Sequence, residues 1–293
     1  MMRNQKTVTV LTVSIALFSA FATLIGILSN GGSGKFHYES IRGKAVEIYG
    51  SGIYRHMSAE VAIQGIAQDF VTFFIGIPLL LTALYFSRKG SFRSRFILTG
   101  ITGYFFVTYL FYLVMGMYSA LFLVYVILAG VSFFALSLNV ISLRSENSAY
   151  LFDAKSSVKF PGWFLITNSV IIGLLWLQVV LPPLFDGSIY PDSLEHYTTL
   201  IVQGLDLSIL LPLSFIAGYQ LLKKSTIGYL IAPVYLVFLS LLMAALVAKI
   251  TYMGLEGYHI IPAIFIIPVL NMMAVYAAIS LLKKLEEPNP AQY

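Results

Sequence analysis

Eight long apolar stretches, each almost free of charged residues, constrain what this chain can fold into more than any other feature. An α-helix needs about 20 apolar residues to cross the ~30 Å hydrocarbon core of a bilayer. Since no water reaches that core, a spanning segment satisfies its own backbone as a helix. The stretches lie at residues 8–29, 61–86, 96–116, 119–142, 162–182, 199–221, 227–251 and 259–282. The sequence therefore predicts an all-α polytopic membrane protein with eight transmembrane helices.

Composition supports this class and excludes others. Hydrophobic residues make up 58% of the chain and charged residues 11%, which is too little polar surface to cover a soluble globule. The basic residues form short clusters at the ends of the apolar stretches, which is typical of membrane topology signals and not of a nucleic-acid surface. The chain has no cysteine, which excludes disulfides and thiolate metal sites. The expected partner is therefore the lipid bilayer and not nucleic acid, and the oligomeric state is left open.

One pattern of residues occurs twice, in the same order and at similar spacing. The first copy reads Gly52-Ile53-Tyr54, Gln64-Gly65, Asp69, Pro78 and Arg88-Lys89. The second copy reads Ser188-Ile189-Tyr190, Gln203-Gly204, Asp206, Pro212 and Lys223-Lys224. Each half holds four spans, an even number, so both halves enter the membrane in the same orientation. The sequence thus predicts an internal duplication into two parallel four-helix repeats (4+4).

The predicted boundaries follow from this duplication. The first membrane repeat covers residues 1–143, and the second covers residues 162–284. Residues 144–161 are polar and form the predicted cytoplasmic connection between them. Residues 285–293 form a polar, proline-containing tail.

The distribution of lysine and arginine predicts the orientation in the cell membrane. Basic residues are enriched in cytoplasmic loops. Placing both termini in the cytoplasm puts thirteen basic residues on that side and leaves five outside, namely Lys35, Arg42, Lys44, Arg55 and Lys249. The chain is therefore predicted to be multi-pass with both termini cytoplasmic.

Asp69 and Asp206 are the main candidates for a functional site. A carboxylate within a membrane span is costly, and such residues are functional candidates by default. Ser58 is a suitable cap for the second helix, and Asp192 with Glu195 resembles a capping box for the sixth. These helix starts predict that each acid lies about three turns into its helix. The alternative is that the acids only complement the dipole of a helix N-terminus.

Polar residues near the two acids extend the candidate substrate-binding site. Gln64 and Gln68 lie on the same span as Asp69, and Gln203 lies one turn before Asp206. Tyr112 and Lys249 lie at similar depth on other spans. Helix packing for the tyrosine and snorkelling to the surface for the lysine are the alternative interpretations.

No metal or cofactor is predicted. His196 and His259 both fall on the outer side, but no metal-ligand spacing such as HExxH is present. A site assembled by these two histidines is the least favoured alternative. The segment Gly31-Gly32-Ser33-Gly34 lacks the lysine of a phosphate-binding loop.

Several segments resemble a group of bacterial multi-pass membrane proteins to which no activity is assigned. The resemblance covers residues 52–234, through GIYRH, AQDFVTFFIGIPLLL, SRKGS, LFLVYV, VQGLDLSILLPLSFIAG and GYLIAP. Members of that group are expected to have arginine and glycine where this chain has Ile66 and Ala67. The resemblance implies the architecture of an eight-helix duplicated protein and no activity.

Three functional hypotheses follow from these features. The first is a transporter or permease for a small solute or ion, with an outward-facing site around Asp69 and Asp206. The second is a non-catalytic accessory or ligand-sensing membrane protein, in which the polar residues only lock helices together. The third is a membrane enzyme acting on a lipid or isoprenoid. The sequence contains no pattern that establishes catalysis.

Overall fold

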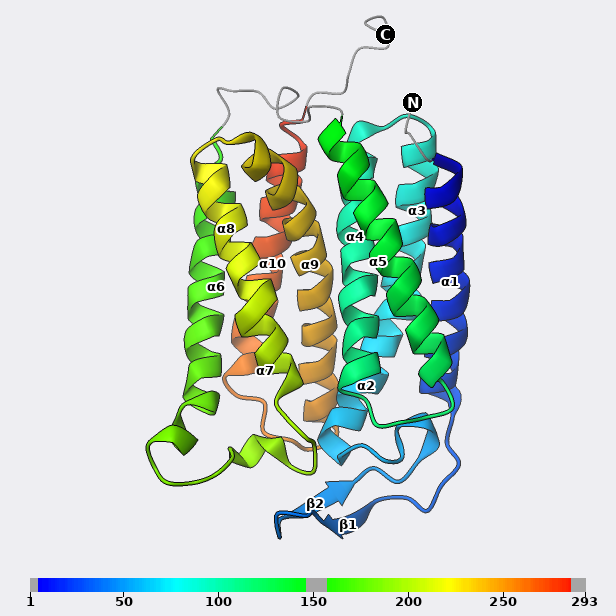
Figure 1. The fold of residues 1–293 in the computed structure, drawn as a ribbon, viewed down its shortest axis with the longest axis vertical. Helices are drawn as coiled ribbons and strands as arrows, with labels where there is room; N and C mark the ends of the chain where they lie inside the picture. Colours follow the sequence, from blue (N-terminus) through cyan, green and yellow to red (C-terminus); the bar gives the residue numbers. More distant parts are fainter. Residues whose placement is uncertain (1–4, 146–156, 286–293) are drawn as a thin grey trace, which may run out of the picture.

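The computed structural model describes residues 5–145 and 157–285 and shows a bundle of long helices (Figure 1). Within these residues, eight helical spans are long and apolar enough to cross a membrane, which confirms the predicted all-α polytopic architecture. Six spans are single helices and two are interrupted. They are α1 (Gln5–Leu28), α2 with α3 (Ala59–Val71, Ile77–Arg88), α4 (Phe92–Val114), α5 (Phe122–Ser145), α6 (Lys159–Val180), α7 with α8 (Ile201–Leu205, Leu211–Leu222), α9 (Thr226–Leu255) and α10 (Ala263–Leu282).

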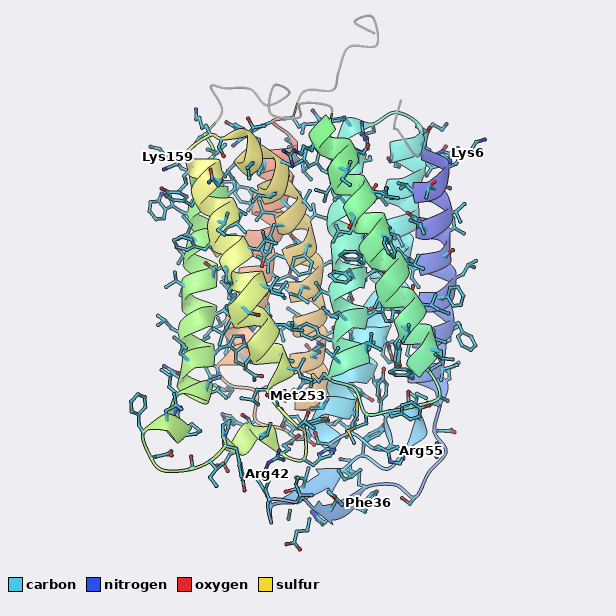
Figure 2. The ribbon with its side chains drawn as sticks, in the orientation of Figure 1. Lys6, Phe36, Arg42, Arg55, Lys159 and Met253 are labelled. Carbon is cyan, nitrogen blue, oxygen red and sulfur yellow. The ribbon has the colours of Figure 1, made fainter. Side chains whose placement is uncertain are left out.

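A two-stranded sheet, absent from the prediction, lies at one end of the bundle. Strands β1 (Phe36–Glu39) and β2 (Ala45–Ile48) pair antiparallel. We call this end the hairpin end; Phe36, Arg42 and Arg55 are found there (Figure 2). Lys6 and Lys159 lie at the opposite end, which we call the terminal end (Figure 2). The two ends provide a reference for depth along the helices.

The first four spans and the last four spans form two neighbouring groups (Figure 1). They meet where α9 packs along α4 and α2. Gly100 of α4 allows this approach, because a Cβ atom there would lie 2.6 Å from the carbonyl oxygen of Val234 on α9. A small residue at a helix crossing permits such close backbone contact within a membrane. By contrast, α4 makes only slight contact with α7 and does not pack along α8.

The second and sixth spans are interrupted in the same way. A π-helical turn, Thr72–Gly76, separates α2 from α3, and another, Asp206–Leu210, separates α7 from α8. Each turn is followed by a helix of 12 residues with proline as its second residue. Proline has no N–H to donate, and π-helical turns are one of the identified places where long helices change course.

The shared turn gives a residue-by-residue correspondence between the two spans. Thr72 and Asp206 are the first residues of the two turns, so Asp69 corresponds in position to Gln203 and not to Asp206. The match continues to the following helices, α4 and α9, whose N-caps Ser91 and Ser225 each accept a hydrogen bond from the N–H three residues later. The correspondence is local; the full 4+4 repeat stays a prediction.

The predicted start of the sixth helix is wrong. Asp192 and Glu195 do not cap it, because Asp192–Leu194 forms a separate 3-10 turn and α7 begins at Ile201. Asp206 therefore lies less than two turns from the start of its span. Asp69 does lie about three turns into α2, which begins after Ser58 as expected, although the Ser58 side chain makes no capping hydrogen bond.

Most of the predicted connection at 144–161 and of the tail at 285–293 falls outside the described residues, which leave out 146–156 and 286–293.

The close approach of α4 and α9 generates a first prediction. Replacing Gly100 with alanine should lower the free energy of unfolding by ~1–3 kcal/mol, because overpacking forces the two backbones apart. Gly130 on α5 is the matched control, since a Cβ there would meet nothing within 4 Å. Thermal unfolding in detergent measures both variants. Equal melting temperatures for Gly100→Ala and Gly130→Ala would contradict the role given to this contact.

Candidate functional site

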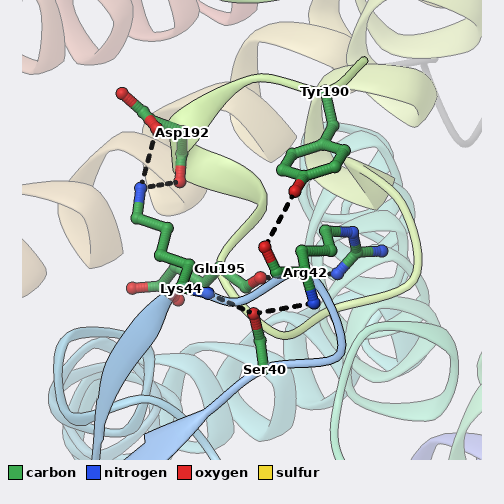
Figure 3. A network of polar contacts seen from close by, with 6 residues as sticks. All are labelled: Ser40, Arg42, Lys44, Tyr190, Asp192 and Glu195. Atoms are coloured by element: carbon green, nitrogen blue, oxygen red, sulfur yellow. Dashed lines mark hydrogen bonds and ion pairs between the residues drawn. The ribbon is translucent and has the colours of Figure 1, made fainter. Parts of the chain in front are cut away.

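Loops from the two helix groups are joined by polar contacts at the hairpin end (Figure 3). The Lys44 ammonium donates to the backbone carbonyl of Asp192 at 2.9 Å and pairs with its carboxylate at 3.0 Å. The Tyr190 hydroxyl donates to the carbonyl oxygen of Arg42 at 3.1 Å. Tyr190 therefore contacts the turn of the hairpin, whereas Tyr54, its counterpart in the sequence pattern, reaches into the bundle.

A second set of contacts extends this joint toward α2. The backbone N–H of Ser58 donates to the Tyr197 hydroxyl at 3.3 Å, and His196 Nε2 lies 3.1 Å from the carbonyl oxygen of His56. Burial raises the pKa of Tyr197 to about 12, so the phenol stays protonated at neutral pH. The segment before α7 is thus fixed to the segment before α2.

Asp69 is held by hydroxyl groups from two other elements. It is 2% exposed, and its Oδ2 accepts a hydrogen bond of 2.5 Å from Tyr54. Its Oδ1 accepts one of 3.1 Å from Tyr112, whose single hydroxyl hydrogen is shared with the carbonyl oxygen of Gly65 at 2.9 Å. Burial, and after it the charge of Asp69, raise the pKa of Tyr54, which keeps this phenol a donor. Both carboxyl oxygens therefore have protein partners.

Gly26 of α1 completes the setting of Asp69. A Cβ atom on Gly26 would lie 1.7 Å from Asp69 Oδ2 and 3.1 Å from the Tyr54 hydroxyl. Only glycine leaves space for the carboxyl group at this point of α1. The Asp69 cluster, which we define as Gly26, Tyr54, Asp69 and Tyr112, thus joins α1, the segment before α2, α2 and α4.

Gln68 belongs to an adjacent hydrogen-bond network between α2 and α4. Its side-chain amide donates to the Tyr104 hydroxyl at 2.7 Å and to Thr108 Oγ1 at 3.3 Å. The Tyr104 hydroxyl also pairs with Thr72 Oγ1 at 2.8 Å. Buried polar groups that are bonded in this way fix the relative position of two helices.

Asp206 has a different environment. It is partly buried, and its Oδ2 accepts a hydrogen bond of 2.8 Å from Trp176 Nε1 of α6. Lys249 of α9 interacts electrostatically with Asp206 and with Asp69. Within the described part of the chain, Lys249 makes no hydrogen bond and no close ion pair, not even with Asp206 or Asp69. Its three N–H donors are therefore unused.

Asp206 and Lys249 share a cavity of about 230 Å³, the Asp206 cavity. Its walls come from α2, α4, α6, α9 and the span that begins with α7. Apolar residues and glycines make up the rest of the lining around seven polar side chains: Gln64, Gln68, Thr108, Tyr112, Trp176, Asp206 and Lys249. A mostly apolar cavity with a few convergent polar groups is typical of a binding site for a small molecule.

The structure brings most of the predicted site residues to this cavity. Gln64, Gln68, Tyr112, Asp206 and Lys249 line it, whereas Asp69 lies behind Tyr112 and Gln203 is not part of the wall. The two acids thus do not face one common cavity.

His196 and His259, the least favoured metal candidates, are not part of this cavity either. His196 packs its ring against Tyr197, with ring centroids 4.5 Å apart. Among the described residues, no group of three or more His, Asp or Glu side chains is arranged to hold a metal ion.

Two residues that sequence reasoning missed contribute to the candidate site. Trp176 supplies the donor to Asp206, and its polar N–H within an apolar span is a signal that sequence reading could have used. Gly26 has no such signal, because the sequence does not show that the Asp69 carboxyl group packs against it.

No family model, curated protein or solved structure matches this chain. The resemblance to a bacterial group of membrane proteins therefore stays a prediction. The fold and the apolar spans define the class as a multi-pass integral membrane protein.

The different environments of the two acids generate a second prediction. Tyr54→Phe should lower the free energy of unfolding by ~1–3 kcal/mol, because it leaves a buried carboxyl oxygen without a donor. Asp206→Asn should change it by less than ~1 kcal/mol, since an amide oxygen still accepts the Trp176 hydrogen bond and the change removes a charge that is costly to bury. Thermal unfolding in detergent compares the variants. A larger loss of stability in Asp206→Asn than in Tyr54→Phe would contradict this assignment.

Proposed function

We propose that this protein is a membrane transporter that binds a small charged or zwitterionic substrate, or the charged head of a larger one, in the Asp206 cavity. The observation that carries the proposal is the unused Lys249 ammonium, which shares a membrane-embedded cavity with the Asp206 carboxylate. An ionisable group in a membrane span is costly to maintain and typically marks a substrate or ion pathway.

The chemistry of the cavity indicates which groups a substrate would carry. Lys249 can receive an anionic group through charge-assisted hydrogen bonds. Asp206 uses Oδ2 for Trp176, and its Oδ1 has no hydrogen-bond partner among the described residues, so this oxygen can accept from a cationic or hydroxyl donor of the substrate. A molecule with both an anionic and a cationic group satisfies both side chains at once.

Asp69 has a structural role in this proposal. Its two oxygens are occupied by Tyr54 and Tyr112, and it does not line the cavity. The Asp69 cluster positions Tyr112, which forms part of the cavity wall. The hypothesis that polar groups lock helices together thus applies to Asp69, and the transport hypothesis applies to Asp206.

The proposed orientation places the hairpin end outside the cell and the terminal end in the cytoplasm. It is supported by the distribution of Lys and Arg over the whole sequence, from which thirteen are predicted to be cytoplasmic and five to be outside. In this orientation the Asp206 cavity lies in the outer half of the membrane, because Asp206 precedes Leu222, the end of α8, by ~24 Å of helix.

Substrate uptake generates the third prediction. Zwitterionic and anionic solutes that raise the melting temperature of the purified protein are tested for uptake into proteoliposomes. Lys249→Met and Asp206→Asn should each lower uptake roughly tenfold, as expected for the loss of one charge-assisted contact. Lys35→Met, which changes an exposed lysine at the hairpin end, is the matched control. Uptake equal to that of protein-free vesicles, or unchanged in both cavity variants, would refute the proposal.

Orientation generates the fourth prediction, which uses the absence of native cysteines. A cysteine at the exposed position Ser188 should react with a membrane-impermeant thiol reagent added to intact cells. A cysteine at the exposed position Lys89 should react only after the cells are opened. The reverse labelling pattern would invert the proposed topology.

A further inference from the structure

We infer that the substrate is a phospholipid with an amine-bearing head, such as phosphatidylethanolamine, whose head enters the Asp206 cavity while an acyl chain lies in an adjoining apolar groove. This inference rests on the proposed function and names the substrate class of the same site. It requires three things of the structure: a groove for the chain, continuity between groove and cavity, and head-group chemistry in the cavity.

The groove lies where α4 and α8 fail to pack against each other. It has a volume of about 220 Å³ and is lined by α4, α5, α9 and the span of α8. Figure 1 shows α9 between α8 on one side and α4 with α5 on the other. We call it the α4/α8 groove; its walls include Gly103, Val107, Leu210, Leu213, Val234 and Phe238. Tyr235 brings a polar group to the lining of the groove, but its hydroxyl donates to the carbonyl oxygen of Leu210. The groove therefore offers an apolar surface only.

The groove and the cavity follow one another along the same helices. On α4, Val107 lines the groove and the next residue, Thr108, lines the cavity. On α9, Phe238 lines the groove and Leu242, one turn later, lines the cavity. On the third wall, Leu210 lies one turn beyond Asp206. A polar cavity thus continues into an apolar groove in the direction of the membrane centre.

The groove is accessible from the surrounding bilayer. Ile209 and Leu213, which line it, are 53% and 40% exposed. Both lie near the middle of a span that crosses the membrane, so their exposed surface faces acyl chains. A lipid of the hairpin-end leaflet has its head near the depth of Asp206 and its chains near the depth of the groove. The order of polar and apolar surface in the protein matches the order in such a lipid.

The head-group preference follows from the two charged side chains. The phosphate is the anionic group for Lys249, and a primary ammonium supplies N–H donors to Asp206 Oδ1. Phosphatidylcholine has the same phosphate, but its quaternary ammonium has no N–H to donate. The cavity should therefore prefer the ethanolamine head over the choline head.

Quenching of tryptophan fluorescence by brominated lipids tests this inference. The chain has two tryptophans, Trp176 in the cavity wall and Trp163, which is 58% exposed on α6. Trp163→Phe leaves Trp176 as the reporter of the cavity, and Trp176→Phe leaves Trp163 as the reporter of bulk lipid. Both proteins are placed in phosphatidylcholine nanodiscs that contain increasing fractions of brominated phosphatidylethanolamine or brominated phosphatidylcholine.

We expect Trp176 to be half-quenched at a roughly tenfold lower fraction of the ethanolamine lipid than of the choline lipid, the effect of about one charge-assisted contact. Trp163 should show no preference. Lys249→Met and Asp206→Asn should remove the preference at Trp176. Equal quenching of Trp176 by both lipids would overturn the inference.

A substitution that fills the groove provides an independent test. Gly103 has space for a side chain, since a Cβ there would meet its nearest neighbours at 3.9 Å. Gly103→Leu should abolish the preference at Trp176, whereas Gly130→Leu, a matched change at an open position of α5, should preserve it. A preference that survives Gly103→Leu would overturn the placement of the chain in the groove.

The two proposals can fail separately. Uptake of a soluble substrate that depends on Lys249, together with no lipid preference at Trp176, would overturn the lipid inference and leave the transport proposal standing. A lipid preference without movement of lipid or solute across the membrane would overturn transport and support lipid binding.

Discussion

The contact between α4 and α9 is the interaction on which the rest of the structure depends. Hydrophobic attraction between helices is weak in a bilayer, so association relies on close van der Waals packing. Gly100 permits that packing, because its missing side chain lets α4 approach the backbone of α9. α9 then serves as a common wall, since it lines both the Asp206 cavity and the α4/α8 groove. The two helix groups are held at this line, and the spaces beside it depend on it.

The two intramembrane acids show how the surroundings of a carboxyl group decide what it can do. Asp69 is enclosed by two phenols and a glycine, so its hydrogen-bonding capacity is directed to protein groups. Asp206 accepts one hydrogen bond, from the Trp176 indole, and lines the Asp206 cavity. A polar group whose hydrogen bonds are all made within the protein stabilises an arrangement of helices, whereas one with an unused donor or acceptor can bind a ligand. Identical side chains on comparable spans therefore support different proposed roles.

The sequence was sufficient to predict features that depend on local pattern. The apolar stretches identified all eight spans found in the described residues, because length and hydropathy are properties of one segment at a time. Ser58 marked the start of α2 correctly, whereas Asp192 and Glu195 marked a 3-10 turn and not α7. A capping pattern shows that a turn of helix can begin there and not that it continues, which depends on tertiary contacts such as the one between Tyr197 and Ser58.

Contacts between distant residues were the part that the sequence could not supply. Polar residues near Asp206 were identified by depth, and five of the seven predicted site residues do line the cavity. The depth of a residue does not reveal which way its side chain points around the helix axis. The sequence therefore did not show that Asp69 and Gln203 point away from the cavity. Gly26 and Trp176 were missed because their importance comes from what faces them on another helix.

The π-helical turns have a consequence for how a charge can be moved within such a span. Both turns precede a proline at the same distance, yet the acid lies at the first residue of one turn and three residues before the other. Three residues are close to one helical turn, so the two carboxyl groups project from similar faces at depths that differ by ~4.5 Å. The two spans thus share the π-helical turn, whereas the position of the acid relative to that turn differs between them. A charge could be shifted along the membrane normal by redistributing residues around the turn, with the course of the helix left as it is.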